Sequence, residues 1–196
     1  MAYYLENKIF IKKRYSSRNV RLLASSYLVI SDFHSILKLE NKAQLIKPSV
    51  IGKSVLIFGA ARILIGNHKE AAAFFKTHME KIKRKDKQWT HWFYGFSNLL
   101  AGNFEATEPE FSSLAVSSND ALISGLSAYF LHSSLEKNSL KPEECRDTAE
   151  YGRKRVVKAL KNADNWDREI KKTGTDIHIA IIRKYIDEAG KWIFDE

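Results

Sequence analysis

The sequence predicts an all-α protein built from stacked antiparallel helical hairpins. Two observations carry this prediction: a segment that repeats after 36 residues, and the lack of any long alternation of apolar and polar residues typical of strands. Such a period is typical of stacked helical units, because each unit needs a neighbour to bury its apolar face. The repeated pairs are Gly59 and Gly95, Gly66 and Gly102, Ala71 and Thr107, and Phe75 and Phe111.

The glycines of the repeat have two predicted roles. Gly66 and Gly102 each follow an apolar run and precede an asparagine, so we expect them to end a helix in the left-handed conformation. Gly59 and Gly95 lie inside the first helix of each copy, where glycine costs about 1 kcal/mol relative to alanine. We interpret them as points where a neighbouring helix approaches closely.

About residues 50–160 resemble the tetratricopeptide-repeat family, most clearly in the second copy. The resemblance lies in Tyr94-Gly95, the turn Gly102-Asn103-Phe104 and Phe111, with a looser third copy starting near Gly125. It implies a right-handed superhelix of about three hairpins, whose first helices line a concave face. It also implies a role in protein–protein interaction.

The other elements follow from local patterns. We expect one domain over residues 1–196, with an N-terminal arm and capping helix over 1–49, repeat hairpins over 50–162 and C-terminal capping helices over 163–196. A basic arm precedes an amphipathic first helix carrying Leu22 to Leu37, and Asn41 to Pro48 form a connector that can include a short second helix. Further helices are expected from Pro142, near Asp164 and from Thr175.

Pro109 affects the second hairpin. Proline disrupts a helix interior, and Thr107 with Glu110 matches a capping box. We therefore expect the second helix of this hairpin to start late, at the sequence TEPE.

Composition limits the cellular setting. The single cysteine, Cys145, excludes an intramolecular disulfide and fits a reducing compartment, so we expect a cytoplasmic protein. The apolar run from Val50 to Ile65 is too short to span a bilayer comfortably, and the N-terminal region lacks the pattern of a signal peptide. Residues 1–100 carry a net charge of +12 and residues 101–150 a net charge of −6.

No motif in the sequence names a reaction. The six histidines are scattered, and no glycine-rich phosphate loop, serine elbow or carboxylate pair is present. We therefore expect a non-catalytic protein without a metal or cofactor.

The predicted partner site is the concave face. Its inward positions are apolar and aromatic, and Trp89 and Trp92 are the expected anchors of a partner. Two alternatives stay open: the chain's own terminal helix fills this groove, or an apolar or amphipathic partner segment binds there. The predicted groove residues are Leu56, Ile63, Trp89, Trp92, Phe96, Leu99, Leu122, Leu126 and Tyr129.

A basic segment borders this predicted groove. It consists of Lys81, Lys83, Arg84, Lys85 and Lys87. Its cations either complement a solvated helix end or form a rim that steers acidic partners. We expect a scaffold, adaptor or assembly factor that binds another protein or itself. The alternative is a nucleic-acid-binding protein that uses this segment with Lys12, Lys13 and Arg14.

Overall fold

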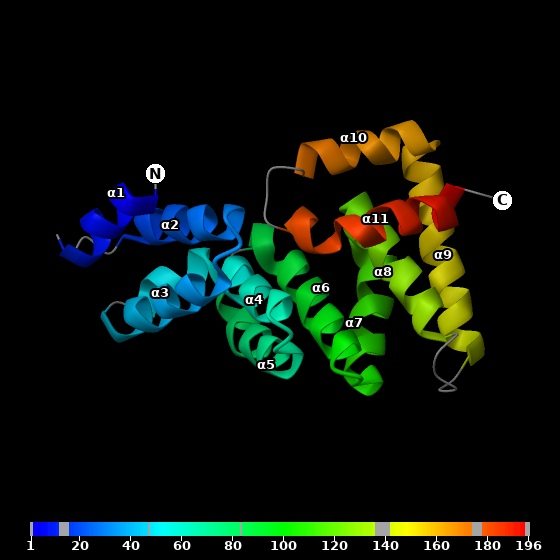
Figure 1. Ribbon diagram of the computed structural model, residues 1–196. Helices are drawn as coiled ribbons and strands as arrows, with labels where there is room; N and C mark the ends of the chain where they lie inside the picture. The colour runs from blue at the N-terminus through cyan, green and yellow to red at the C-terminus, as the bar shows by residue number, and fades with distance from the viewer. Residues whose placement is uncertain are drawn as a thin grey trace. The chain divides into compact units, whose positions relative to one another are not determined.

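The computed structural model describes residues 2–11, 16–46, 48–82, 84–135, 142–173 and 178–194. The prediction of an all-α protein is confirmed for these residues, which form eleven α-helices and no strand (Figure 1). The chain divides into two compact units, Met1–Phe93 and Tyr94–Glu196, and the division falls inside helix α6. The expectation of a single domain stays a prediction.

The N-terminal unit is a layered set of short helices. Its α-helices are α1 (Ala2–Glu6), α2 (Ser17–Val29), α3 (Phe33–Ile46), α4 (Val55–Leu64), α5 (His68–His78) and the first part of α6 (Arg84–Leu100). A π-helical segment η1 (Asn7–Ile11) and the 3-10 helices η2 (Pro48–Lys53) and η3 (Met79–Lys81) join them. Helix α2 packs on α1, α3 and α4, and the Tyr27 hydroxyl donates a hydrogen bond to Glu6.

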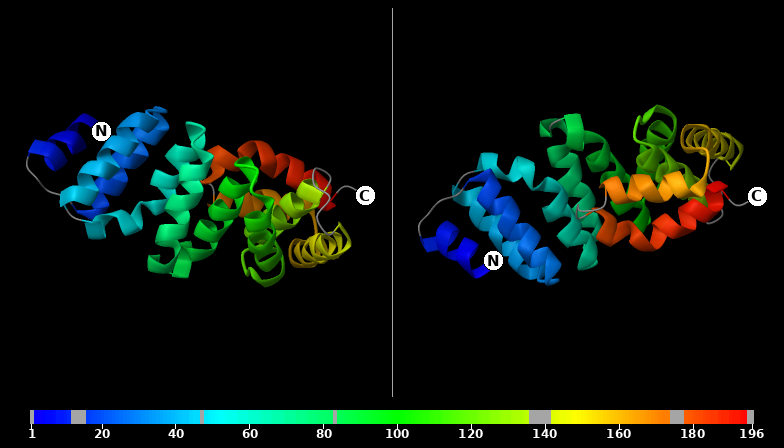
Figure 2. Two further views of the ribbon diagram at one scale, coloured as in Figure 1. Left: turned by 90° about the horizontal axis from the view of Figure 1, so that it is seen from below. Right: turned by 90° about the horizontal axis from the view of Figure 1, so that it is seen from above.

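The C-terminal unit is built around α8. Its helices are the rest of α6, α7 (Phe104–Ser117), α8 (Ala121–Leu135), α9 (Pro142–Leu160), α10 (Ala163–Thr173) and α11 (His178–Phe194). Helix α8 packs against α7, α9, α10 and α11, and α10 and α11 lie side by side (Figure 2). The Trp166 side chain of α10 is buried against Gly125 of α8 and Gly190 of α11.

The two repeat copies form the predicted hairpins, α4–α5 and α6–α7. Their turns share the same hydrogen bonds: Gly66 N–H donates to Ile63 O at 3.0 Å, and Gly102 N–H donates to Leu99 O at 3.1 Å. Gly66 has a φ of 83° and Gly102 a φ of 75°, the left-handed conformation that was predicted. The repeated glycines therefore form the same turn in both hairpins.

The glycines inside the first helices also have matching neighbours. A Cβ atom added at Gly59 would lie 2.0 Å from Phe75 Cζ, and one added at Gly95 would lie 3.1 Å from Phe111 Cε1. In each hairpin the phenylalanine of the second helix therefore packs on the glycine of the first, which confirms the predicted close approach of a neighbouring helix. Gly125 does not continue this pattern, because its neighbours are Trp166 of α10 and Ile193 of α11.

Two local predictions were wrong. The helix predicted across Leu22 to Leu37 is interrupted, because Ser31 has a left-handed φ of 58° and Asp32 begins the next helix by accepting a hydrogen bond from Ser35 N–H at 3.1 Å. Helix α7 does not start late either: it begins at Phe104 and contains Pro109. Pro109 and Glu105 are exposed, so water can satisfy the Glu105 carbonyl that loses its N–H partner.

Candidate functional site

The predicted groove residues of the N-terminal unit lie mainly in its interior. The Trp92 side chain has no exposed area, and Trp89 and Ile63 are also buried, whereas Leu56 is half-buried. The Trp92 ring lies 5.2 Å from the Phe93 ring between centroids, and the Phe93 ring stacks at 5.8 Å on Phe75. These tryptophans therefore pack as core residues, and a partner-anchoring role for them stays a prediction.

The C-terminal unit buries its own share of the predicted groove. Phe96, Leu122 and Leu126 are buried, and Leu99 and Tyr129 are half-buried. Helix α11 contacts two of these residues, Phe96 and Tyr129. The Tyr185 ring is 5.6 Å from the Phe96 ring, and the Tyr129 hydroxyl donates to Glu188 at 2.9 Å. Within this unit α11 therefore packs beside Phe96 and Tyr129, and the groove itself stays a prediction.

The predicted basic rim falls largely outside the described side chains. This holds for Lys81, Lys83, Arg84 and Lys85, and the arm cations Lys12, Lys13 and Arg14 lie outside the described residues. Lys87 is described: its Nζ lies 3.8 Å from Glu80 Oε2, and the side chains of Lys87 and Glu80 are 44% and 76% exposed. An exposed pair of this kind contributes little stability, so Lys87 remains accessible to a partner.

A buried ion pair in the N-terminal unit was not predicted from the sequence. Arg62 Nη1 lies 2.6 Å from Glu40 Oε2 and Nη2 lies 3.1 Å from Oε1, so the guanidinium holds both carboxylate oxygens. The Glu40 side chain is only 3% exposed. Arg62 also lies over the Phe74 ring, 4.3 Å from its centroid. Its neighbours are all within the unit, so this pair joins α3, α4 and α5 rather than forming a site.

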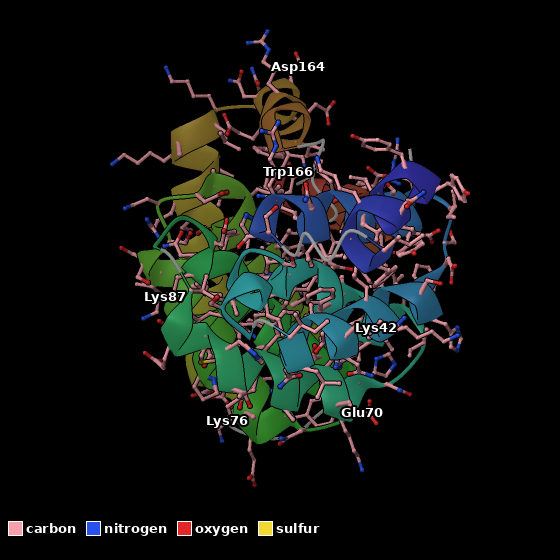
Figure 3. The ribbon with its side chains drawn as sticks, turned by 90° about the vertical axis from the view of Figure 1, so that its left-hand side faces the viewer. Lys42, Glu70, Lys76, Lys87, Asp164 and Trp166 are labelled. Atoms are coloured by element: carbon pink, nitrogen blue, oxygen red, sulfur yellow. The ribbon has the colours of Figure 1, made fainter. Side chains whose placement is uncertain are left out.

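Exposed apolar side chains concentrate at the start of the chain. Eight of the eleven large hydrophobic residues that the described structure exposes precede residue 47. Three of them, Ile11, Leu45 and Ile46, lie where the end of η1 meets the end of α3, with exposed fractions of 73%, 86% and 57%. The contact that joins these two ends is Lys42 Nζ over the Phe10 ring, at 4.4 Å (Figure 3 labels Lys42). We call Ile11, Leu45, Ile46 and Lys42 the η1–α3 patch.

This patch carried a weak signal in the sequence. Leu45 and Ile46 fall in the segment that was interpreted as a connector, where apolar residues have no expected face. The structure extends α3 through this segment and ends it at Ile46, so both side chains leave the last turn of a helix. Exposed apolar residues that gather in this way are typical of interaction surfaces.

The described residues hold neither a cluster of metal ligands nor a membrane-spanning helix. No group of three or more His, Cys, Asp and Glu side chains that could hold a metal ion occurs among them. In the same residues, no helix is both long and apolar enough to cross a membrane. Cys145 is a buried free thiol.

Comparison with known proteins gives two matches. A family model described as "Uncharacterised Treponema protein" matches residues 35–195. An "Uncharacterized protein" of Treponema pallidum (strain Nichols) is 26% identical over 207 aligned residues. The alignment covers 99% of this chain but only 64% of that relative, so the chain spans less than two thirds of the relative's length. No solved structure matches.

Proposed function

The chain belongs to the family described as uncharacterised Treponema protein, and we propose that this member is a non-catalytic protein–protein interaction module. In this proposal the N-terminal unit receives an apolar or amphipathic segment of a partner protein on the η1–α3 patch. The observation that carries the proposal is the exposure of Ile11 at the end of η1 and of Leu45 and Ile46 at the end of α3, two ends that the Lys42–Phe10 contact joins. Burying such side chains against a partner removes apolar surface from water, the main driving force of association.

The charge of the N-terminal unit favours an acidic partner. Residues 1–93 contain 18 Lys and Arg against 6 Asp and Glu, a net charge of +12. Residues 94–196 contain 14 against 17, a net charge of −3. A basic surface steers an acidic partner and raises its association rate, while apolar contacts slow its dissociation. The partner segment that fits both properties is amphipathic and acidic.

The proposal includes a tetratricopeptide-like arrangement of the hairpins. It is supported by the equal period of α4–α5 and α6–α7, their matching turns and their matching glycine–phenylalanine contacts. Action in the cytoplasm is a further part of the proposal, supported by the single buried thiol of Cys145.

Site-specific photo-crosslinking in cells followed by reconstitution tests the patch. A photoreactive amino acid at Leu45 is expected to crosslink a partner, which is then purified and titrated by calorimetry. The Leu45→Asp variant is expected to weaken that binding by about tenfold or more, because a charge replaces an apolar contact at the interface. Leu45 is 86% exposed, so the variant is expected to fold with little change in stability.

Tyr151→Asp is the matched control. Tyr151 is an exposed apolar residue of α9 in the other unit, and the substitution changes net charge equally. Binding by this control should stay within about twofold of wild type, a negligible free-energy difference. Equal loss in both variants would contradict the patch assignment. Sedimentation velocity distinguishes binding of another protein from self-association. A wild-type dimer that becomes a monomer in Leu45→Asp would assign the patch to a second copy of this chain.

Nucleic-acid binding is a second candidate, favoured by the +12 charge of residues 1–93. Its test is the fluorescence anisotropy of short single-stranded and duplex probes at about 50 and 200 mM salt, because phosphate contacts release counterions and depend steeply on salt. Lys83, Arg84 and Lys85 are replaced together by glutamine, with Lys38, Lys69 and Lys76 as a charge-matched control. Absence of binding at the lower salt concentration would remove this candidate.

A further inference from the structure

The C-terminal unit contains an open cavity between the second half of α9, the start of α10 and the end of α11. Its volume is about 600 Å³. Small-molecule sites in proteins have volumes of about 300–1,000 Å³, so the cavity is large enough for an organic ligand. It lies far in the sequence from the η1–α3 patch, and the inference drawn from it is independent of the proposed function.

Three lysines at the end of α9 line the cavity. Lys154 and Lys158 are four residues apart on one face of α9, and Lys161 directly follows the last residue of the helix, Leu160. Like charges at this spacing destabilise a helix unless something neutralises them. Lys154 Nζ lies 3.6 Å from Glu150 Oε1, whereas Lys158 and Lys161 have no ion pair among the described residues. Two cations are therefore available to an anion.

The remaining charges of the lining are already engaged. Arg153 Nε donates to the Ile193 carbonyl at 3.1 Å, and its Nη1 lies 3.6 Å from Glu150 Oε2. Glu150 is the single carboxylate that lines the cavity among the described residues, so the lining has four cations against one anion. Arg153 fixes the end of α11 against α9, which holds Ile193 and Phe194 at the cavity.

Apolar side chains from both α9 and α11 complete the lining. Val157 of α9 and Phe194 of α11 are half-buried, and Ile193 is buried beside them. A ligand that only carries charge would leave these apolar side chains in contact with water. A purely apolar ligand would separate Lys158 and Lys161 from water without a counterion. The lining therefore favours a molecule with both properties.

We propose that this cavity binds a small amphiphilic organic anion. Its acid group, a carboxylate, sulfonate or phosphate, lies between Lys158 and Lys161, and its apolar body lies against Val157 and Phe194. Charge-assisted hydrogen bonds to the two ammonium groups orient the ligand, and burial of the apolar body supplies further affinity.

Octanoate is the probe, with 1-octanol and inorganic phosphate as the apolar and anionic halves of the same test. The full chain is titrated by calorimetry, and amide chemical shifts locate the site. Octanoate is expected to saturate a single site and to shift amides of α9 and α11 near Val157 and Ile193. Octanol and phosphate are each expected to bind at least about tenfold more weakly than octanoate, because each lacks one of the two contacts.

The deciding variant is Lys158→Gln with Lys161→Asn. Lys161 has a left-handed φ of 70°, a conformation that asparagine tolerates better than most residues, so this change removes charge without straining the end of α9. Octanoate binding is expected to weaken about tenfold. The control is Lys69→Gln with Lys76→Gln, two exposed lysines of α5, which lowers net charge equally and should change binding less than twofold. Failure of octanoate to saturate, or equal loss in both variants, would overturn the proposal.

Discussion

The hairpins α4–α5 and α6–α7 share a sequence period and a turn but use equivalent positions differently. Arg62 and Asn98 are 36 residues apart, and each donates a side-chain hydrogen bond to the carbonyl four residues earlier, Phe58 or Tyr94, at 3.0 Å. Arg62 continues to Glu40 of α3, outside its hairpin, whereas the Asn98 side chain accepts from Asn103 in its own turn at 3.0 Å. Residues that recur with the period therefore form the same backbone turn in both hairpins. The second partner of each polar side chain depends on the helices packed around its hairpin.

The largest expected difference between the hairpins concerns these two polar residues. Arg62→Ala leaves the buried Glu40 carboxylate without its cation, so we expect the free energy of unfolding to fall by about 3–5 kcal/mol. Asn98→Ala removes two ordinary hydrogen bonds, and its expected cost is about 1 kcal/mol each. Urea unfolding followed by far-UV circular dichroism measures both.

A double variant identifies the cause of the larger loss. Arg62→Met with Glu40→Leu replaces the ion pair with apolar side chains and is expected to recover most of the stability, because no buried charge remains unpaired. A double variant as unstable as Arg62→Ala would show that geometry specific to the guanidinium, including its contact with Phe74, holds α3 to this hairpin.

The glycine–phenylalanine contacts give the next largest difference. At Gly59 an added Cβ would lie within 2.6 Å of three atoms of the buried Phe75 ring, which also stacks on Phe93. Gly59→Ala is therefore expected to lower the free energy of unfolding by about 1–3 kcal/mol through overpacking. At Gly95 the nearest atoms lie at 3.1 and 3.2 Å, so small shifts and the roughly 1 kcal/mol helix preference of alanine should nearly cancel. Thermal unfolding of the two alanine variants compares them directly, and equal losses would contradict the difference in packing.

The comparison also shows which features the sequence could predict. The turns at Gly66 and Gly102 and the contacts of Gly59 and Gly95 were predicted because they depend on residues that recur with the period. The Arg62–Glu40 pair was missed because its members are separated by 22 residues and belong to different helices. The break at Ser31 was missed because serine rarely adopts a positive φ, although Asp32 is a strong helix-capping residue. The contact of α11 with Phe96 was foreseen only as one of two alternatives, because its partners are too distant in sequence for a local pattern to decide between them.

The smallest expected difference concerns two helix-capping aspartates, one in each unit. In the N-terminal unit, hydrogen bonds from the Ser35 side chain and backbone to the Asp32 carboxylate lower its pKa. In the C-terminal unit, burial raises the pKa of Asp120, although its carboxylate accepts hydrogen bonds from Ile123 N–H at 3.2 Å and Leu122 N–H at 2.9 Å. A lowered folded pKa stabilises the fold above the unfolded value of about 3.9 and loses that contribution as the pH falls through the folded pKa. A raised folded pKa has the opposite effect, because the folded state binds the proton more tightly.

The two asparagine variants should therefore differ from wild type with opposite pH dependence. Asparagine keeps the capping role but does not titrate. As the pH falls from 7 toward about 4, wild type should gain stability relative to Asp120→Asn, because protonation relieves the buried charge. Below that pH, wild type should lose stability relative to Asp32→Asn, because protonation weakens the bonds from Ser35. Denaturant midpoints of the three proteins across this pH range measure both slopes, and slopes of the same sign would show that capping by these two residues is electrostatically alike.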